Sequence, residues 1–134
     1  MTIKTKPNVG RYRDLDAIFT PHPATADVRR RIDAEAVKFA VKSLVMTKYY
    51  ERLFQPNIGS NVPNLLFEQM SPITTQLLRD SIVNVIQNYE PRVTIDSVDI
   101  EPDYDDQSYD VNIRFTIQNL ADPITLNFVL SRTR

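Results

Sequence analysis

The five residues Tyr89-Glu90-Pro91-Arg92-Val93 join two different patterns in this 134-residue chain. Apolar residues recur at helical spacing before them and at every second position after them. Proline fixes its own φ and disfavours helical geometry in the residue before it, so a helix is expected to end here. Glu90 and Arg92 therefore flank a rigid joint, where they can brace the joint as a local ion pair or hold a partner.

The residues before the joint have the period of an amphipathic helix. The pattern predicts a helix that starts at Ser71-Pro72 or Thr74 and continues to about residue 89. Asn and charged residues lie between the apolar ones, as on a solvated face. The apolar stripe steps by 4, 3, 1 and 3 positions and consists of Leu78, Ile82, Val85, Ile86 and Tyr89.

The residues after the joint alternate with a period of two, which is typical of strands with one buried face. The apolar phase shifts between Ile95 and Val98, so a bulge or bend is expected near Asp96-Ser97. The second strand is the clearest, with apolar residues at 109, 111, 113, 115 and 117, and a third strand follows over about 124–130.

Three consecutive strands with short turns predict an antiparallel meander. Because helices come first and strands last, the fold class is α+β, with helices on one face of the sheet. The other helical segments are a second main helix over 33–46, with Asp33 as its N-cap, and a short helical turn near Pro63 to Phe67. Residues 47–63 are expected to form a loop or short hairpin.

The N-terminal segment differs from the rest of the chain. Pro7, Pro21 and Pro23 interrupt it and no helical period appears, so we predict an extended arm over 1–26 and a single domain over 27–134. Residues 1–52 contain 11 Lys or Arg and 6 Asp or Glu, a balance of +5, whereas residues 53–134 contain 5 and 11, a balance of −6. Such a division of charge suits docking between oppositely charged neighbours.

Composition excludes several classes of protein. Hydrophobic residues make up 42% and charged residues 25%, as in ordinary globular domains. There are no cysteines, so no disulfide or thiolate metal site is expected. No apolar run approaches the roughly 18–20 residues that span a bilayer, and the first residues do not resemble a secretory signal. We expect no membrane partner.

A series of short motifs runs along the middle of the chain: Glu51-Arg52-Leu53-Phe54-Gln55-Pro56, then Gly59-Ser60, then Leu66-Phe67-Glu68, and last Tyr89-Glu90-Pro91-Arg92-Val93. In this order and spacing they resemble the GPW-type baseplate wedge proteins, the sheath initiators of contractile phage tails, which have counterparts in type VI secretion systems. The resemblance covers about residues 14–130. One departure is Tyr50, which stands where that family usually has glycine.

The resemblance implies a structural protein without cofactor or catalytic residue, present in several copies in the virion tail baseplate and made in the host cytoplasm. In that family the Glu-Pro-Arg motif is implicated in attachment to the core bundle of the wedge, so the resemblance implies this role for Glu90, Pro91 and Arg92. The family's C-terminal strands resemble a domain of the tail sheath protein and accept a strand from a sheath subunit, so the resemblance implies this second role for the strand region 109–130. The other partner-binding residues expected here are Arg114, Ile124, Leu126 and Phe128; the tail tube is a further candidate partner.

The same family has carried a lysozyme-like label, so a tail-associated peptidoglycan hydrolase is the alternative function. Such enzymes pair two carboxylates roughly 5–9.5 Å apart, one of them with a raised pKa. Glu90 is one acid available, and Glu101, Asp103, Asp105 and Asp106 crowd a polar turn without an apolar pocket that would raise a pKa. An adaptor domain outside any tail is a third reading.

Three remaining features favour structural interpretations. His22, the only histidine, lies between two prolines and is interpreted as a loop residue rather than part of a catalytic triad. The acidic turn at 103–106 lacks the ligand spacing and glycine of a calcium loop, so no metal site is predicted. Arg29-Arg30-Arg31 is not interleaved with aromatic residues, which favours acidic protein neighbours over nucleic acid.

Overall fold

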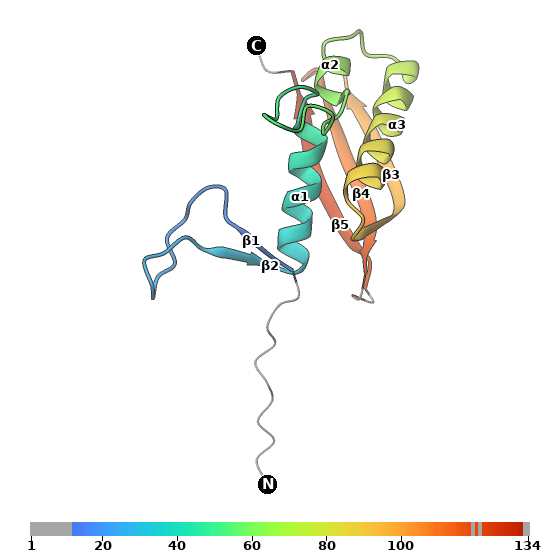
Figure 1. Ribbon diagram of the computed structural model, residues 1–134. Helices are drawn as coiled ribbons and strands as arrows, with labels where there is room; N and C mark the ends of the chain where they lie inside the picture. Colours follow the sequence, from blue (N-terminus) through green and yellow to red (C-terminus); the bar gives the residue numbers. More distant parts are fainter. Residues whose placement is uncertain (1–11, 119, 121, 133–134) are drawn as a thin grey trace. The chain divides into compact units, whose positions relative to one another are not determined.

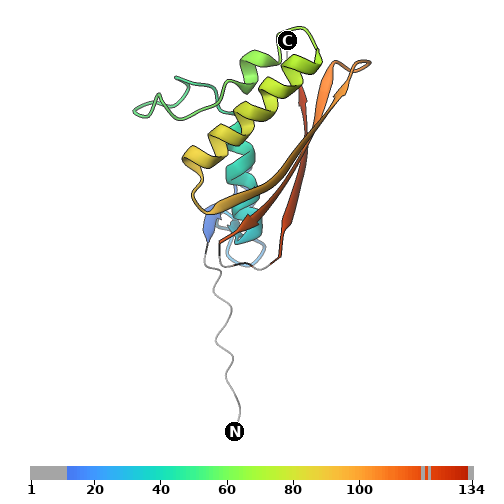
Figure 2. The same ribbon diagram turned by 90° about the vertical axis from the view of Figure 1, so that its right-hand side faces the viewer.

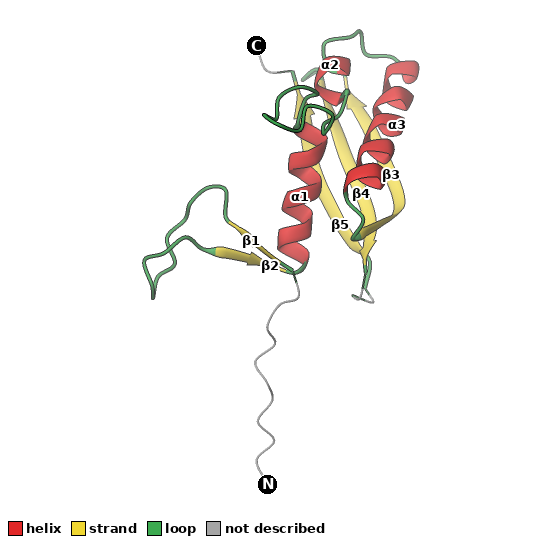
Figure 3. Ribbon diagram, viewed as in Figure 1, coloured by secondary structure: helices red, strands yellow, loops and turns green. Residues whose placement is uncertain are grey.

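The computed structural model describes residues 12–118, 120 and 122–132, which form two compact units (Figure 1). The units comprise Met1–Phe39 and Ala40–Arg134, so their boundary falls within the first helix. Figure 3 shows that the second unit combines helices with a sheet of three strands. The predicted α+β class is therefore confirmed.

The N-terminal unit contains a two-stranded antiparallel sheet that the sequence analysis missed. β1, Arg13–Leu15, pairs with β2, Arg30–Ile32. Pro21 and Pro23 lie in the connection between them, where a missing backbone N–H does not interrupt the ladder. The paired strands lie on either side of residue 26, where the sequence predicts the boundary between arm and domain. Residues 1–11 of the predicted arm lie outside the described residues.

The first helix, α1, spans Ala34–Met46, as predicted. Asp33 precedes it with a left-handed φ of 49°, unlike the extended conformation usual for an N-cap. Its backbone oxygen accepts from Val37 N at 3.1 Å, while its Oδ1 accepts the backbone N–H of Tyr12 at 3.1 Å. The side chain therefore ties the helix start to the residue before β1. The predicted apolar face is buried: Val37, Val41, Leu44 and Val45.

Two further helices follow in the second unit: α2, Val62–Leu65, and α3, Pro72–Tyr89. Ser71 begins α3 as its N-cap, with Oγ accepting the N–H of Thr74 at 3.1 Å. The predicted stripe is buried at Leu78, Ile82, Val85 and Ile86. None of the helices that the structure describes is long and apolar enough to cross a membrane.

Two aromatic residues near helix ends are exposed, and one of them, Tyr89, belongs to the apolar stripe predicted for α3. α2 ends after one turn at Leu65, so Phe67 lies beyond it with 62% of its surface exposed, and the guanidinium of Arg132 stands 6.0 Å from its ring centroid. Tyr89, in the last turn of α3, is 37% exposed and donates its hydroxyl to the carbonyl of Asn57 at 2.7 Å. It braces a loop rather than filling the core.

The loop between α1 and α2 has no regular strand pairing, only an isolated bridge between Lys48 and Ser60. Tyr50, which stands where the resembled family usually has glycine, adopts a left-handed φ of 67°, and Phe54 has a φ of 68°. This conformation brings Cβ close to the following carbonyl oxygen and costs roughly 1–2 kcal/mol for a residue with a side chain. The backbone thus keeps a turn that favours glycine while carrying bulky residues.

The sheet of the second unit is the predicted meander. β3, Val93–Asp103, pairs with β4, Ser108–Ile117, which pairs with β5, Ile124–Ser131, all antiparallel. Ile95 faces Phe115 and Ser97 faces Arg114, so Asp96 is an extra residue in β3. This confirms the bulge that the shift in apolar phase predicted.

One face of the sheet is covered and the other is open. α3 lies against the covered face, where it contacts β3, and α2 packs on α3 (Figure 2). The inward side chains of β4 are all buried: Tyr109, Val111, Ile113, Phe115 and Ile117. The alternate residues, Asp110, Asn112 and Arg114, are exposed. The core of the second unit therefore contains the inward face of β4 together with the buried residues of α3.

Ile113 offers a direct test of this packing. It is fully buried at the centre of β4, so Ile113→Asp places an unpaired charge in the core and is expected to cost about 4 kcal/mol or more. Urea unfolding followed by circular dichroism measures the change. Thr125→Asp, on the exposed face of β5 opposite Arg114, is the matched control and should change stability by less than about 0.5 kcal/mol. A wild-type transition for Ile113→Asp would contradict the assigned inward face.

Candidate functional site

The joint at Pro91 is built by the end of α3 and the beginning of β3. Glu90 leaves the helix with φ −124° and ψ 80°, while its N–H still donates to Ile86 O at 2.9 Å. The N–H of Val93 then donates to Glu90 O at 3.2 Å. The chain thus turns from helix to strand within three residues, as the fixed φ of proline predicts.

Glu90 and Arg92 bind each other across the proline. Arg92 Nε donates to Glu90 Oε1 and Arg92 Nη2 to Glu90 Oε2, each at 2.6 Å, which is a bidentate pair. The side chain of Glu90 is 7% exposed and that of Arg92 is 34% exposed. The sequence left open a local brace or a grip on a partner, and the structure shows the local pair. Only the arginine side of it reaches solvent appreciably.

Gln118 fastens this joint to the far end of β4, a role that the sequence analysis missed. Its N–H donates to Arg92 O and its Nε2 to Pro91 O, each at 2.9 Å. The register was the available signal, because pairing of Val93 with Ile117 brings Gln118 opposite Arg92. Glu90, Pro91, Arg92 and Gln118 together form the elbow of the second unit.

The two edges of the sheet differ in chemistry. β3 carries a bulge, Pro102 and several carboxylates, which are features that protect an edge against further pairing. β5 contains neither charge nor proline from Ile124 to Ser131. Within the described residues it pairs only with β4, which leaves half of its backbone groups directed away from the sheet. β5 is therefore the edge suited to accept another strand.

The predicted binding residues of the sheet take different positions around this edge. Ile124 and Leu126 are only partly covered, whereas Phe128 is buried with 8% exposure. Phe128 can therefore meet a partner through its backbone, not its ring. Arg114 is exposed on the open face, opposite Ser97 and Thr125, so the structure does not bring it to the edge or to the elbow.

The open face of the sheet holds a shallow hollow of about 360 Å³ with three carboxylates in its lining. Glu101 and Asp110 stand directly opposite each other on β3 and β4, and Asp99 lies two residues along. They are exposed, and the hollow is open to solvent. No group of three or more potential metal ligands comes together in the part of the chain that the structure describes.

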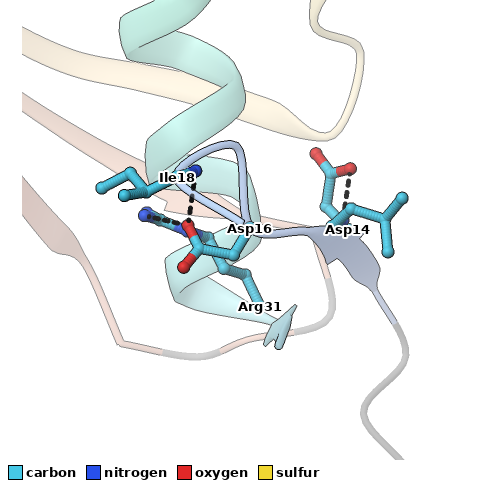
Figure 4. Close-up of polar contacts among 5 residues, drawn as sticks. Asp14, Asp16, Ile18 and Arg31 are labelled. Atoms are coloured by element: carbon cyan, nitrogen blue, oxygen red, sulfur yellow. Dashed lines mark hydrogen bonds and ion pairs between the residues drawn. The ribbon is translucent and has the colours of Figure 1, made fainter. Parts of the chain in front are cut away.

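A second ion pair organises the N-terminal hairpin (Figure 4). Arg31 donates from Nε at 3.1 Å and from Nη2 at 2.8 Å to Asp16 Oδ1, and the same oxygen accepts the N–H of Ile18 at 3.4 Å. The hydrogen bonds from Arg31, with help from Thr20, hold the pKa of Asp16 below its usual value. The Arg31 guanidinium also stacks on Phe39, 4.6 Å from the ring centroid. One member of the predicted arginine cluster is thus structural.

Comparisons with known proteins identify related chains. The model of the family described as baseplate wedge protein gp25 matches residues 24–121, which include α1, α2, α3, the elbow, β3 and β4. Baseplate wedge protein gp25 of Enterobacteria phage T4 is 33% identical over 98 residues, which are 73% of this chain and 74% of that protein.

Two solved structures show the same fold. One is a proposed tail lysozyme from Geobacter sulfurreducens, with a TM-score of 0.66 and 16% identity over 73% of this chain and 89% of that chain. The other belongs to the baseplate of the anti-feeding prophage, with a TM-score of 0.63 and 20% identity over 92% of this chain and 87% of that chain. At these identities the likeness concerns the fold alone.

The Asp16–Arg31 pair predicts an acid transition in the hairpin. Because the folded pKa of Asp16 is lowered, its contribution to stability is present above the unfolded value of about 3.9 and is lost as pH falls through the folded pKa. The amide signals of Ile18 and Arg31, followed by NMR from pH 6 to pH 2, should therefore shift below about pH 4. In Asp16→Asn this transition should be absent. Signals that move instead between pH 5 and 6 would contradict the assignment.

Proposed function

The chain belongs to the baseplate wedge protein gp25 family, and on this premise we propose that it attaches to the wedge core through the elbow and starts the sheath by accepting a strand at β5. As a family member it is a structural component of the phage tail baseplate, assembled there in several copies with other baseplate components. The attachment and the strand addition are the two proposed steps.

The observation that carries the strand-addition step is the difference between the two edges. β3 is protected by its bulge, proline and carboxylates, whereas β5 is uncharged over eight residues. A strand from a sheath subunit would satisfy the outward backbone groups of β5, and its side chains would cover Ile124 and Leu126. Alternation along β5 would fix the register of the incoming strand.

The attachment step rests on the exposure of Arg92 beside a buried carboxylate. Glu90 occupies the fork of Arg92 on one side and keeps the guanidinium in a fixed orientation. A third of the arginine side chain remains at the surface, where a partner carboxylate or carbonyl can approach it. The ion pair therefore serves as a brace in the free protein and as a preorganised contact in the assembly.

The peptidoglycan hydrolase alternative finds less support in the geometry. Glu90 is shielded from solvent and engaged with Arg92, so it is not available to protonate a substrate. Glu101 and Asp110 face each other on an open sheet face rather than in an apolar pocket. Relatives and fold neighbours carry both kinds of name, but the relative at 33% identity is named as a baseplate wedge protein.

Substitutions at Arg92 distinguish its role in stabilising the joint from its proposed contact with a partner subunit. Arg92→Ala removes the fork from a buried carboxylate and should lower the free energy of unfolding by about 1–3 kcal/mol. Arg92→Lys keeps one charged hydrogen bond to Glu90, so it should remain folded yet enter baseplates poorly. The measurements are thermal unfolding of the free protein and its amount in purified particles by quantitative mass spectrometry.

Arg30→Lys, an exposed arginine of β2, is the matched control and should enter particles normally. The proposed attachment would be contradicted if Arg92→Lys entered particles at the wild-type level, and if Arg92→Ala also did so at temperatures where the variant is folded. The Glu90–Arg92 pair would then only stabilise the joint.

A charge at the edge of β5 tests strand addition. Leu126→Lys places an inward-facing cation on a partly covered edge residue, a substitution that opposes pairing with another strand. The variant should still enter the baseplate, while electron microscopy should show tails without sheath. Thr125→Lys, on the other face of the same strand, should give sheathed tails. Sheaths of normal length on Leu126→Lys particles would exclude β5 as the accepting edge.

A further inference from the structure

The loop between α1 and α2 presents apolar side chains that the functions above do not use. Figure 2 shows the loop extending beyond the helices on the side away from the sheet. Leu53 is 86% exposed, Phe54 is 101% exposed and Tyr50 is 82% exposed. The three side chains cover no core. Aromatic residues that are exposed in this way are favoured as anchors at the centres of protein interfaces.

The backbone of this loop is strained at two of these residues. Tyr50 and Phe54 both adopt left-handed φ angles, of 67° and 68°, which residues with a bulky side chain rarely take. In the free protein neither side chain gains burial in return. Strained residues of this kind persist where the surrounding structure holds them, and they are frequent at binding sites.

Hydrogen bonds around the loop supply that support. Tyr50 N donates to Pro56 O at 3.0 Å, and Lys48 N donates to Glu51 Oε2 at 2.8 Å. The base is closed by Ser60 N donating to Thr47 O at 2.8 Å. Gly59 is needed at this closure, because a side-chain carbon there would lie 2.8 Å from the Lys48 backbone. The loop is therefore preorganised, which lowers the entropy lost on binding.

We propose that Leu53 and Phe54 insert into an apolar pocket with an acidic rim on a different subunit of the baseplate. The apolar part of this chemistry follows from the exposed side chains. The acidic rim follows from charge, because Arg52 is exposed beside them while the one carboxylate of the loop tip, Glu51, accepts a bond from the loop's own backbone. This surface, residues 50–54, is distinct from the elbow and from β5.

A second copy of the chain is a less suitable partner. Its apolar hollow of about 230 Å³ is lined by Met46, Leu66, Phe67 and residues of β5. Arg132 also lines this hollow, with its guanidinium over Phe67 and its Nε donating to Leu66 O at 3.3 Å. An arginine at the rim would repel the Arg52 that accompanies Phe54, so charge favours a partner of different sequence.

Phe54→Ser tests whether the loop docks at all. The variant removes an exposed ring, so the free protein should melt cooperatively at or above the wild-type temperature. Its amount in purified particles should fall at least tenfold. Phe67→Ser removes another exposed phenylalanine outside the loop and is the matched control, which should enter particles normally. Wild-type incorporation of Phe54→Ser would overturn the proposal, whatever the behaviour of the elbow and β5 variants.

A photo-crosslinking residue identifies the partner. The photoreactive side chain p-benzoylphenylalanine, placed at position 54 and activated in assembled tails, should give an adduct with one different baseplate protein. Peptide mapping should locate the adduct in an apolar segment with Asp or Glu nearby. An adduct with a second copy of this chain, or none in tails that contain the labelled protein, would overturn the proposed partner.

Discussion

The turn at Pro91 is the constraint on which the second unit depends. The helix and the strand meet there without a loop. The angle between α3 and β3 at this turn therefore decides which face of the sheet α3 covers. The Glu90–Arg92 pair fixes the side chains of the joint, and the two hydrogen bonds from Gln118 fix the joint to the end of β4. Because these contacts link residues on both sides of the proline, they hold the end of α3 to the start of β3 and to the end of β4.

The position of the helices also decides what the sheet can do. With α3 on one face, the core is filled from that side, and the strands leave one open face and two edges. The carboxylates fall on the open face and along β3, where opposed like charges such as Glu101 and Asp110 are unfavourable for the free protein. β5 remains the uncharged edge. The distribution of charge therefore protects the β3 edge against pairing and leaves the β5 edge available.

Local patterns predicted much of this fold, and contacts distant in sequence account for what was missed. Strict alternation in β4, the phase shift at Asp96 and the stripe of α3 are set within a few residues, and each was predicted. The hairpin of β1 and β2 consists of three-residue strands paired across a long connection, too short to show a period. Likewise, a sequence cannot decide whether Glu90 and Arg92 bind each other or a partner, since both uses need the same two charges.

Several features of this chain are unfavourable for an isolated protein and are explained by its place in an assembly. Left-handed aromatic residues, exposed apolar side chains and an uncapped strand edge each lower the stability or solubility of an isolated domain. Several of them lie in the 47–60 loop and at β5, whereas the elbow holds a buried carboxylate in a bidentate ion pair. A protein that worked alone would gain by replacing Tyr50 with glycine and Leu53 with a polar residue. Their presence in a loop held by its own backbone bonds argues that the compensating contacts come from neighbouring subunits.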